Sequence, residues 1–239
     1  MSVRQLAGRT AVVTGASRGI GRSLALLLAS RGARVLAVAR SEPELGTLRE
    51  EARRHEGDVF PLPGNLRDPA FLARLPAEAK RVVGDVDILV NNAGWAPRRT
   101  PFDRHREEDI RAMLELNLEA AVFLTFFFLP EMKRRNRGWV LNVGSAFAFD
   151  PRPGEAVYLA TKAALHVFSR CLARELGSHG IRVGVLAPAH VDTALLPANR
   201  RVDRAAFLRP REVAEAALPF FLASEPEDDV EIRVARGDG

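Results

Sequence analysis

The sequence predicts an α/β fold: a Rossmann-like, doubly wound parallel sheet of about seven strands with helices on both faces. Short β-branched or apolar runs alternate with long amphipathic stretches, and the expected strands are apolar on both faces, as strands covered from two sides must be. The length of 239 residues suits one well-buried domain, since two domains would each be small. We therefore expect a single domain over residues 1–239.

The expected strands follow one another along the whole chain. They lie near Thr10–Thr14, Arg34–Ala39, Val59–Pro61, Ile88–Asn91, Gly138–Val143, Arg182–Ala187 and Val230–Val234. The intervals carry apolar residues at helical spacing and predict helices, two of them over Glu107–Arg134 and Glu155–His179. Pro97–Pro101 and Pro188–Arg209 predict loops after strands, where such sheets bind ligands, so a substrate loop insertion is expected around residues 188–209.

The composition is that of a globular protein, with 47% hydrophobic and 27% charged residues. The longest apolar run, Ala120–Pro130, is too short to cross a bilayer, and the N-terminus shows no signal peptide. A cytoplasmic protein without a membrane partner is the resulting expectation. The single cysteine, Cys171, excludes an internal disulfide and is expected to fill the core, because leucines surround it at helical spacing. No metal site is predicted.

The net charge of +5 raises the question of nucleic-acid binding. Only Lys80, Lys133 and Lys162 are lysines among the 35 basic residues, and most arginines stand beside acids on polar helix faces. There is no basic stripe interleaved with aromatic residues and no helix-turn-helix pattern. We therefore expect no nucleic-acid partner.

A glycine-rich turn follows the first expected strand and precedes a helix. It comprises Gly15, Ser17, Arg18, Gly19, Ile20 and Gly21. Glycines let the backbone approach phosphates closely, and a helix N-terminus offers free N–H groups and a positive dipole. The turn therefore predicts a site for a dinucleotide pyrophosphate, although its glycine spacing differs from GxGxxG.

The end of the second expected strand distinguishes the two nicotinamide cofactors, since an acid there binds a ribose 2′-hydroxyl. This chain instead has Arg40 and Ser41, and Arg18 lies in the turn. Two guanidinium groups and a hydroxyl suit a 2′-phosphate. NADP(H) is therefore favoured over NAD(H), the alternative being that Arg40 is merely solvated.

Tyr158 and Lys162 stand one helical turn apart, so a phenol and an ammonium share one helix face. A free tyrosine has a pKa of about 10, and acid chemistry near neutrality calls for roughly three units of depression, which an adjacent cation ordinarily supplies. Ser145 ends the fifth expected strand, where a hydroxyl faces the ligand crevice and can bind a carbonyl oxygen.

Together with Asn91-Asn92-Ala93-Gly94 and Asn117, these motifs make the chain resemble the classical short-chain dehydrogenase/reductase (SDR) family over nearly its whole length. The resemblance implies reversible hydride transfer between C4 of a nicotinamide and a carbonyl or secondary alcohol. It assigns proton donation to Tyr158 and orientation of the carbonyl oxygen to Ser145. Lys162 would lower the tyrosine pKa and bind the nicotinamide ribose, and Asn117 would hold a water that links Lys162 to solvent.

The resemblance also predicts further cofactor contacts. Asn91 and Ala93 are expected along the adenosine ribose, Gly94 is expected among the cofactor-binding residues, and Val191 and Thr193 are expected near the nicotinamide carboxamide. Two positions depart from the family pattern: Asn65-Leu66 lacks the usual acid near the adenine, and Pro188-Ala189 replaces Pro-Gly. Both departures are expected to alter cofactor affinity at most.

The substrate pocket is predicted to be apolar and built from loops at the strand ends. Its candidate residues are Trp95, Phe147, His190 and Leu195, with Pro97, Phe149, Pro151 and Leu196 nearby. A 3-oxoacyl thioester reductase is one family member that the pattern resembles, and Arg98, Arg99, Arg200 and Arg201 either attract an acidic carrier or are solvated loop charges.

Apolar residues on the two long helices, among them Phe123, Phe126, Phe127 and Phe128, exceed what one sheet face can cover. The family commonly pairs these helices across two-fold axes, so a homotetramer is expected, with a dimer second; the alternative is that the aromatic run belongs to the chain's own core. Two alternatives to an NADPH-dependent carbonyl reductase remain: a non-catalytic NADP-binding sensor, which the intact Ser145, Tyr158 and Lys162 disfavour, and an NAD-dependent alcohol dehydrogenase, which Arg18 and Arg40 disfavour.

Overall fold

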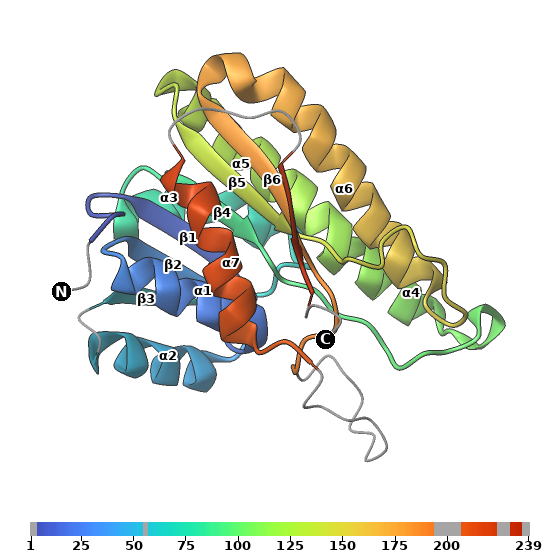
Figure 1. Cartoon of the computed structure of the whole chain (residues 1–239). Helices are drawn as coiled ribbons and strands as arrows, with labels where there is room; N and C mark the ends of the chain where they lie inside the picture. Colours follow the sequence, from blue (N-terminus) through green and yellow to red (C-terminus); the bar gives the residue numbers. More distant parts are fainter. Residues whose placement is uncertain (1–3, 55–56, 194–206, 224–229, 236–239) are drawn as a thin grey trace.

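Seven parallel strands form the central sheet of the computed structural model, in the order β3-β2-β1-β4-β5-β6-β7 (Figure 1). The structure describes residues 4–54, 57–193, 207–223 and 230–235. The strands are β1 (Thr10–Thr14), β2 (Arg34–Ala39), β3 (Asp58–Pro63), β4 (Ile88–Asn91), β5 (Gly138–Val143), β6 (Ile181–Pro188) and β7 (Val230–Val234). This order, with a crossover between β3 and β4, is that of a doubly wound sheet and confirms the predicted Rossmann-like fold.

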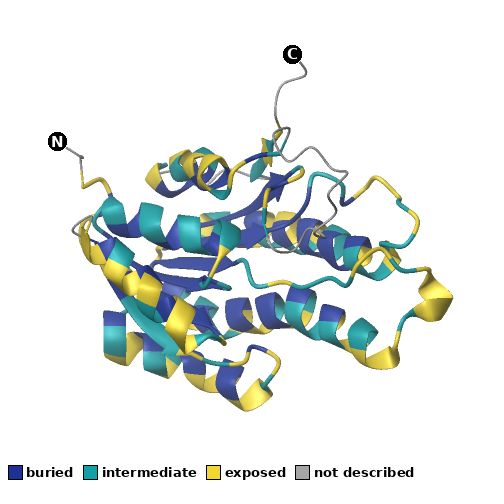
Figure 2. Cartoon of the chain, turned by 90° about the horizontal axis from the view of Figure 1, so that it is seen from below, coloured by how far each residue is buried: buried dark blue, intermediate teal, exposed yellow. Residues whose placement is uncertain are grey.

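Helices cover both faces of the sheet. Their bounds are α1 (Gly19–Ser30), α2 (Glu42–Arg54), α3 (Pro69–Val83), α4 (Glu107–Leu114), α5 (Ala120–Arg134), α6 (Ala156–Leu176) and α7 (Pro210–Leu222). Buried residues of α1, α2 and α7 pack on one face, and those of α3, α5 and α6 pack on the other. Figure 2 shows the resulting pattern, in which the strands and the inward sides of the helices are buried.

Alternate residues of each strand enter opposite cores, because side chains in a strand point to opposite faces in turn. Ala11 and Val13 of β1 join the core under α1, and Val12 between them joins the core under α3. All five residues of this strand are buried. Burial on both faces explains why the strands read as continuous apolar runs in the sequence.

A single long helix runs from α4 to α5 through a π-helical turn at Glu115–Glu119. By length and composition alone this 28-residue stretch would be able to span a membrane, and 39% of its most apolar window is buried within the fold. Leu124, Phe128 and Met132 pack against the sheet. The helix has the bounds that the sequence predicted, Glu107–Arg134, and extends beyond the apolar run Ala120–Pro130 at both ends.

Most predicted boundaries agree with the structure. β3 and β6 are longer than expected, and α6 ends at Leu176, where the separate 3₁₀ turn Gly177–His179 follows. The prediction for Cys171 was wrong, because this residue is exposed. Ser169 and Ala173 of α6 face inward, and Cys171 lies between them on the outer side of the helix with Val167.

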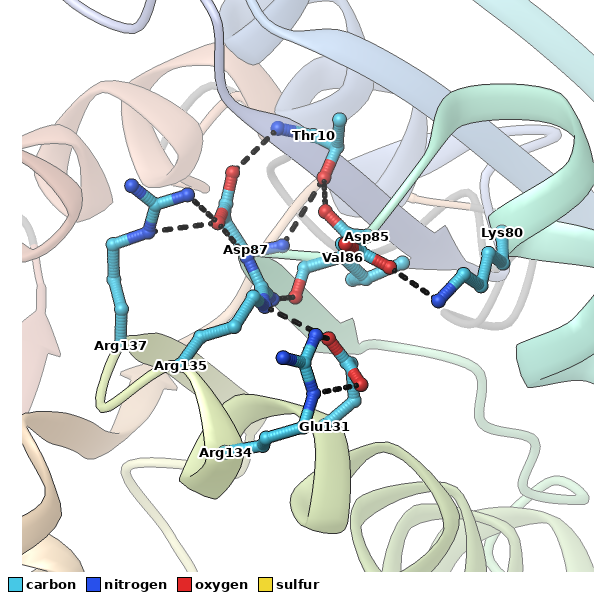
Figure 3. Close-up of polar contacts among 9 residues, drawn as sticks. All are labelled: Thr10, Lys80, Asp85, Val86, Asp87, Glu131, Arg134, Arg135 and Arg137. Atoms are coloured by element: carbon cyan, nitrogen blue, oxygen red, sulfur yellow. Dashed lines mark hydrogen bonds and ion pairs between the residues drawn. The ribbon is translucent and has the colours of Figure 1, made fainter.

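An ionic network fastens the edge of the sheet at which β4 begins (Figure 3). The buried carboxylate of Asp87 accepts hydrogen bonds from Arg135 at 2.7 Å, from Arg137 at 2.7 Å and from the backbone N–H of Thr10 at 3.1 Å. Arg135 also bonds to the carbonyl of Val86. The network joins β1, β4 and the chain between α5 and β5, at the edge opposite the carboxyl ends of the strands.

Candidate active site

A cavity of about 1420 Å³ lies along the carboxyl ends of the strands. The turns that follow β1, β2, β4, β5 and β6 all contribute to its wall, together with one face of α6. Parallel strands bring these turns to one edge of the sheet, so residues far apart in the sequence meet there. The predicted residues that line the cavity are Gly15, Ser17, Arg18, Gly19, Ile20, Arg40, Ser41, Asn65, Leu66, Ala93, Gly94, Trp95, Pro97, Arg98, Arg99, Ser145, Phe147, Tyr158, Lys162, Pro188, His190, Val191 and Thr193.

The glycine-rich turn has the close approach that the sequence predicts. Gly15 and Gly19 have φ angles of +63° and +58°, which side chains with a Cβ rarely adopt. Gly21 lies behind the cavity wall in the first turn of α1, and a Cβ there would collide with the carbonyl oxygen of Gly15 and the amide of Asn92. The turn therefore presents backbone rather than side chains at the N-terminus of α1, as a bound pyrophosphate requires.

Asn92, for which the sequence predicted no role of its own, ties the glycine-rich turn to the end of β4. Its Nδ2 donates to the carbonyl oxygens of Thr14 at 2.9 Å and Gly15 at 3.2 Å. In return the Thr14 hydroxyl accepts from the backbone N–H groups of Asn92 at 2.9 Å and Ala93 at 3.1 Å. These contacts make the two turns one rigid unit.

Arg18 and Arg40 stand at the same end of the cavity, and both are exposed. Neither guanidinium forms an ion pair with another residue of the described part of the chain, so both remain available to an anion. Glu44 is the acid that lines this end with them. Asn65 accepts a hydrogen bond from the backbone N–H of Arg67 at 3.1 Å and shapes the turn after β3.

Tyr158 and Lys162 lie on the cavity-facing side of α6, as predicted, and the ammonium lies 5.8 Å from the centre of the phenol ring. The direction of the tyrosine shift differs from the expectation. Burial, with a smaller contribution from the carboxylate of Glu155, raises the pKa of Tyr158 to about 12. Burial likewise lowers the pKa of Lys162 to about 8. Desolvation thus outweighs any depression of the tyrosine pKa by the lysine in the protein alone.

The ammonium of Lys162 has a backbone partner, since its Nζ donates a hydrogen bond of 2.7 Å to the carbonyl of Val143. This contact fixes the lysine against the end of β5. The phenol is protonated at neutral pH, which is the form that a general acid must have.

Ser145 is 6% exposed and opens onto the cavity just beyond β5. Its Oγ accepts a hydrogen bond from the backbone N–H of Phe147 at 3.2 Å. A serine hydroxyl has one proton to donate, and this acceptor role leaves the proton free for an oxygen in the cavity. The arrangement therefore suits Ser145 for binding a carbonyl oxygen.

Asn117 lies in the π-helical turn, a form that often marks functional positions in helices. Its side-chain amide binds both backbone groups of Trp95: Oδ1 accepts from the Trp95 N–H at 2.7 Å, and Nδ2 donates to the Trp95 carbonyl at 2.9 Å. A Cβ on Gly94 would lie 3.3 Å from Asn117 Oδ1 and 3.7 Å from Lys162 Nζ. Asn117 thus holds the loop that covers Lys162, and its predicted role toward a water stays a prediction.

The structure places the side chain of Asn91 away from the cavity. Its Nδ2 donates to Asn142 Oδ1 at 2.8 Å and to Thr125 Oγ1 at 3.2 Å, so it forms a buried polar link between β4, β5 and α5. Asn91 and Asn142 are register partners in the sheet. Asn92 and Ala93 line the cavity, and the cofactor contact predicted for Asn91 stays a prediction.

Aromatic rings and one arginine form the wall at the substrate end. Phe147 lies 4.7 Å from His190, and His190 lies 5.3 Å from Phe207, measured between ring centres. The guanidinium of Arg152 stacks 3.6 Å above Phe147. Burial, together with the charges of Arg152 and Arg99, lowers the pKa of His190 below its ordinary value. Arg152 and Phe207 were not predicted, since nothing in their spacing marks them.

The two ends of the predicted substrate loop are joined. Val191 forms a parallel bridge with Leu208, and the backbone N–H of Leu208 donates to the carbonyl of His190 at 2.9 Å. Thr193 lies over the glycine-rich turn, since a Cβ on Gly19 would be 3.2 Å from its methyl group. Leu195, Leu196, Arg200 and Arg201 lie outside the described residues, and Phe149 and Pro151 do not line the cavity.

The residues present fit a nicotinamide dinucleotide, because the glycine cradle, the N-terminus of α1 and the exposed Arg18 and Arg40 match the parts of such a molecule. Within the described ranges no group of three or more His, Cys, Asp or Glu side chains is placed to hold a metal ion.

Comparison with known proteins agrees with this geometry. A family model described as short chain dehydrogenase matches residues 9–203. The chain is 33% identical over 244 residues to 3-oxoacyl-(acyl-carrier-protein) reductase FabG of Thermotoga maritima, with 98% of each chain covered. It is 36% identical over 227 residues to the protein of the same name from Escherichia coli, with 91% of each covered.

Solved structures show the same architecture. A metagenomic short-chain oxidoreductase in complex with NADP matches with a TM-score of 0.84 at 29% identity, over 97% of this chain and 98% of that chain. A 7α-hydroxysteroid dehydrogenase complexed with NADH and 7-oxo glycochenodeoxycholic acid matches with a TM-score of 0.89 at 28% identity, over 99% of this chain and 96% of that chain.

Proposed function

Because this chain belongs to the short-chain dehydrogenase family, and so to the NAD(P)-dependent oxidoreductases, we propose that it reduces a ketone with NADPH as hydride donor. The observation that carries the proposal is the shared cavity, in which Ser145, Tyr158 and Lys162 stand next to the glycine-rich turn. A cofactor cradle and a set of proton-transfer groups in one cavity are what hydride transfer to a carbonyl needs.

The preference for NADPH rests on Arg18 and Arg40. Both guanidinium groups line the cavity beside Ser41, at the end of β2 where an acid would bind an unmodified ribose. A 2′-phosphate would accept charge-assisted hydrogen bonds from these groups. Glu44 is nearby, but it is exposed and screened by solvent.

The chain's own residues handle the proton and the oxygen, and the nicotinamide, when bound, supplies the hydride. Tyr158 carries its proton at neutral pH and would donate it to the carbonyl oxygen as negative charge develops there. Ser145 would donate a hydrogen bond to the same oxygen through its free hydroxyl proton. Lys162, held by Val143, would bind the nicotinamide ribose and place its positive charge near the reacting groups.

A 3-oxoacyl thioester is the substrate class that we favour. The two relatives named above carry the name of 3-oxoacyl reductases. The substrate end of the cavity joins an aromatic wall to Arg98, Arg99 and Arg152, so an acyl chain and an anionic handle both find suitable contacts. Arg99 is paired with Glu155, and Arg98 therefore is the better candidate for attracting a carrier.

We also propose a homotetramer, with a dimer as the second choice. Phe123 and Phe126 on α5 are 46% and 65% exposed, Leu114 on α4 is 40% exposed, and Val167 on α6 is 55% exposed. Phe128 belongs to the core, so only part of the aromatic run is left to a partner. An apolar surface of this kind is typical of a subunit interface, which sedimentation velocity would detect.

Nicotinamide fluorescence and absorbance test the proposal. NADPH and NADH are titrated first, and ketones, diketones, quinones and 3-oxoacyl thioesters are then added while the absorbance of NADPH is followed. We expect tighter binding of NADPH and oxidation of NADPH with at least one 3-oxoacyl thioester. Binding without turnover across the panel would instead support a sensor, and tighter binding of NADH would contradict the role of Arg40.

Tyr158→Phe removes the phenolic hydroxyl and keeps the ring, so it tests the proposed proton donor with little other change. We expect it to bind NADPH as the wild type does and to lose at least about 100-fold in kcat, the usual contribution of a general acid. Full turnover by this variant would refute the assignment of the proton donor.

A further inference from the structure

His166 is a buried titratable residue for which the proposed chemistry has no use. It follows Lys162 by one turn of α6 and is 2% exposed. Its Nε2 accepts a hydrogen bond from the backbone N–H of Ser145 at 3.5 Å. A Cβ on Gly144 would lie 2.5 Å from the same nitrogen, so the glycine lets the ring approach the turn after β5.

The opposite side of the ring faces the last strand. Nδ1 of His166 lies 3.7 Å from Oε2 of Glu231 on β7, and the other oxygen of that carboxylate accepts from Arg233 at 2.6 Å. The ring of Phe149 stands edge-on to the imidazole, with 5.3 Å between ring centres. The imidazole is thus enclosed by the turn after β5, by β7 and by Phe149.

These neighbours favour one tautomer of the neutral His166 imidazole. An acceptor at Nε2 requires the neutral ring with its proton on Nδ1, and that proton then faces the carboxylate of Glu231. The partner of one ring nitrogen decides which nitrogen of a histidine carries the proton, and the negative charge of Glu231 favours a proton on the nearer Nδ1. A series of contacts therefore runs from Ser145 at the cavity through His166 to Glu231 on the last strand, β7.

We propose that His166 is a positioning residue, which in its neutral Nδ1–H form fixes the backbone of Ser145 while Glu231 selects that form. The inference rests on the proposed function, since Ser145 orients a carbonyl oxygen only if the protein reduces ketones. Small displacements of such a group are costly, because an error of about 1 Å in a reacting geometry can reduce the rate about 100-fold.

The charges around the ring set how it responds to acid. Burial is the largest influence and lowers the pKa of His166; the carboxylate of Glu231 from β7 and the backbone contact with Ser145 raise it, and Lys162 from α6 and Arg233 from β7 lower it. The ring is therefore neutral at pH 7. Acidification through its lowered pKa adds a proton to Nε2, which removes the acceptor for Ser145 and places a positive charge near Lys162.

Two substitutions at His166 distinguish the effect of its hydrogen-bond acceptor from the effect of side-chain packing. His166→Gln keeps an acceptor at a reach similar to that of Nε2 and does not titrate, whereas His166→Leu keeps the volume without an acceptor. His179→Gln, the same change at a histidine of the 3₁₀ turn after α6 that lies beside Ser178 and not beside Ser145, is the control. We expect kcat of His166→Leu to fall about tenfold, the equivalent of one hydrogen bond, with an unchanged Kd for NADPH. His166→Gln should retain most of the wild-type kcat and lose the acid limb of the pH profile.

Equal losses of kcat in the two His166 variants would show that packing matters and would overturn the proposal, as would a wild-type kcat in His166→Leu. A readout independent of turnover is the titration of His166 by NMR, compared between wild type and Glu231→Gln. Loss of the carboxylate charge should lower the pKa of His166 further, and an unchanged value would refute the role of Glu231. If the wild type reduces no carbonyl but this titration behaves as expected, the proposed function fails while the link between Glu231 and His166 stands.

Discussion

Lys162 donates a hydrogen bond of 2.7 Å to the backbone carbonyl of Val143, so the ammonium of α6 is fastened to the last residue of β5. The Lys162 side chain is only 5% exposed, although the proposed function requires its positive charge near the reacting groups. Burial disfavours the charged form of Lys162, whereas the proposed function needs this positive charge in the cavity. Such a conflict between stability and function is common at active sites.

The buried Lys162 predicts an unusual dependence of stability on pH. Its pKa is about 8 in the folded protein against 10.5 ordinarily, so the unfolded chain binds more protons between these values. The free energy of unfolding should therefore rise as the pH increases from about 8 to about 10, by up to roughly 3 kcal/mol from this group. Urea denaturation of the ligand-free protein at several pH values measures it.

Lys162→Met should remove this dependence and, at pH 7, raise the free energy of unfolding by a similar amount, about 2–3 kcal/mol, while turnover is lost. A variant that is less stable than the wild type at pH 7 would show that the hydrogen bond to Val143 outweighs the cost of burying the charge.

Arg40→Ala should weaken NADPH binding about 10- to 100-fold, the equivalent of a lost charge-assisted hydrogen bond of roughly 1.5–3 kcal/mol, and leave NADH binding nearly unchanged. Arg49→Ala removes the same charge from α2 at a position that does not line the cavity, and it controls for the loss of net charge. Fluorescence titration with both cofactors gives the two affinities. An equal loss for NADPH and NADH would show that Arg40 does not contact the 2′-phosphate.

Gly21→Ala should destabilise the protein by about 1–3 kcal/mol, because the new methyl group collides with the Gly15 carbonyl and the Asn92 amide. It should also weaken NADPH binding, since the collision displaces the glycine-rich turn. Gly46→Ala in α2 is the matched control, with no atom within 4 Å of the added Cβ. That control should gain up to about 1 kcal/mol from helix propensity, which thermal unfolding of both variants would reveal.

Asp87→Asn should lower the free energy of unfolding by about 2–4 kcal/mol and leave the kcat of the folded fraction unchanged. The substitution keeps the shape of the side chain but removes the charge that holds Arg135 and Arg137 (Figure 3). None of these three residues lines the cavity. Glu107→Gln breaks the exposed pair with Arg111 and should change stability by less than about 0.5 kcal/mol. Similar values for the two variants would mean that the Asp87 network contributes little.

The sheet could be predicted because its strands are buried on both faces, and the cofactor end could be predicted because close backbone approach demands glycine. Side-chain direction was harder. Asn91 and Asn92 are adjacent and chemically identical, yet one joins Asn142 inside the fold and the other lines the cavity. The alternation of a strand settles this only once its last residue is known.

Electrostatics were harder still. The sequence correctly predicted that Tyr158 and Lys162 lie on the same face of a helix. The direction in which the tyrosine pKa shifts, however, depends on how much water reaches the phenol, and no sequence pattern reports that. Cys171 failed for a related reason, since leucines at helical spacing show that a helix has an apolar face but do not assign each residue to it. Arg152 and Phe207 reach the cavity through loops, whose paths leave no periodic trace in the sequence.

The bridge between Val191 and Leu208 gives the substrate loop two anchored ends on the scaffold. The chain therefore leaves the scaffold at Val191 and returns to it at Leu208 with a separation that the bridge fixes. A protein engineer who alters the predicted substrate loop to test the proposed ketone specificity would keep His190, Val191 and Leu208 as its fixed joints.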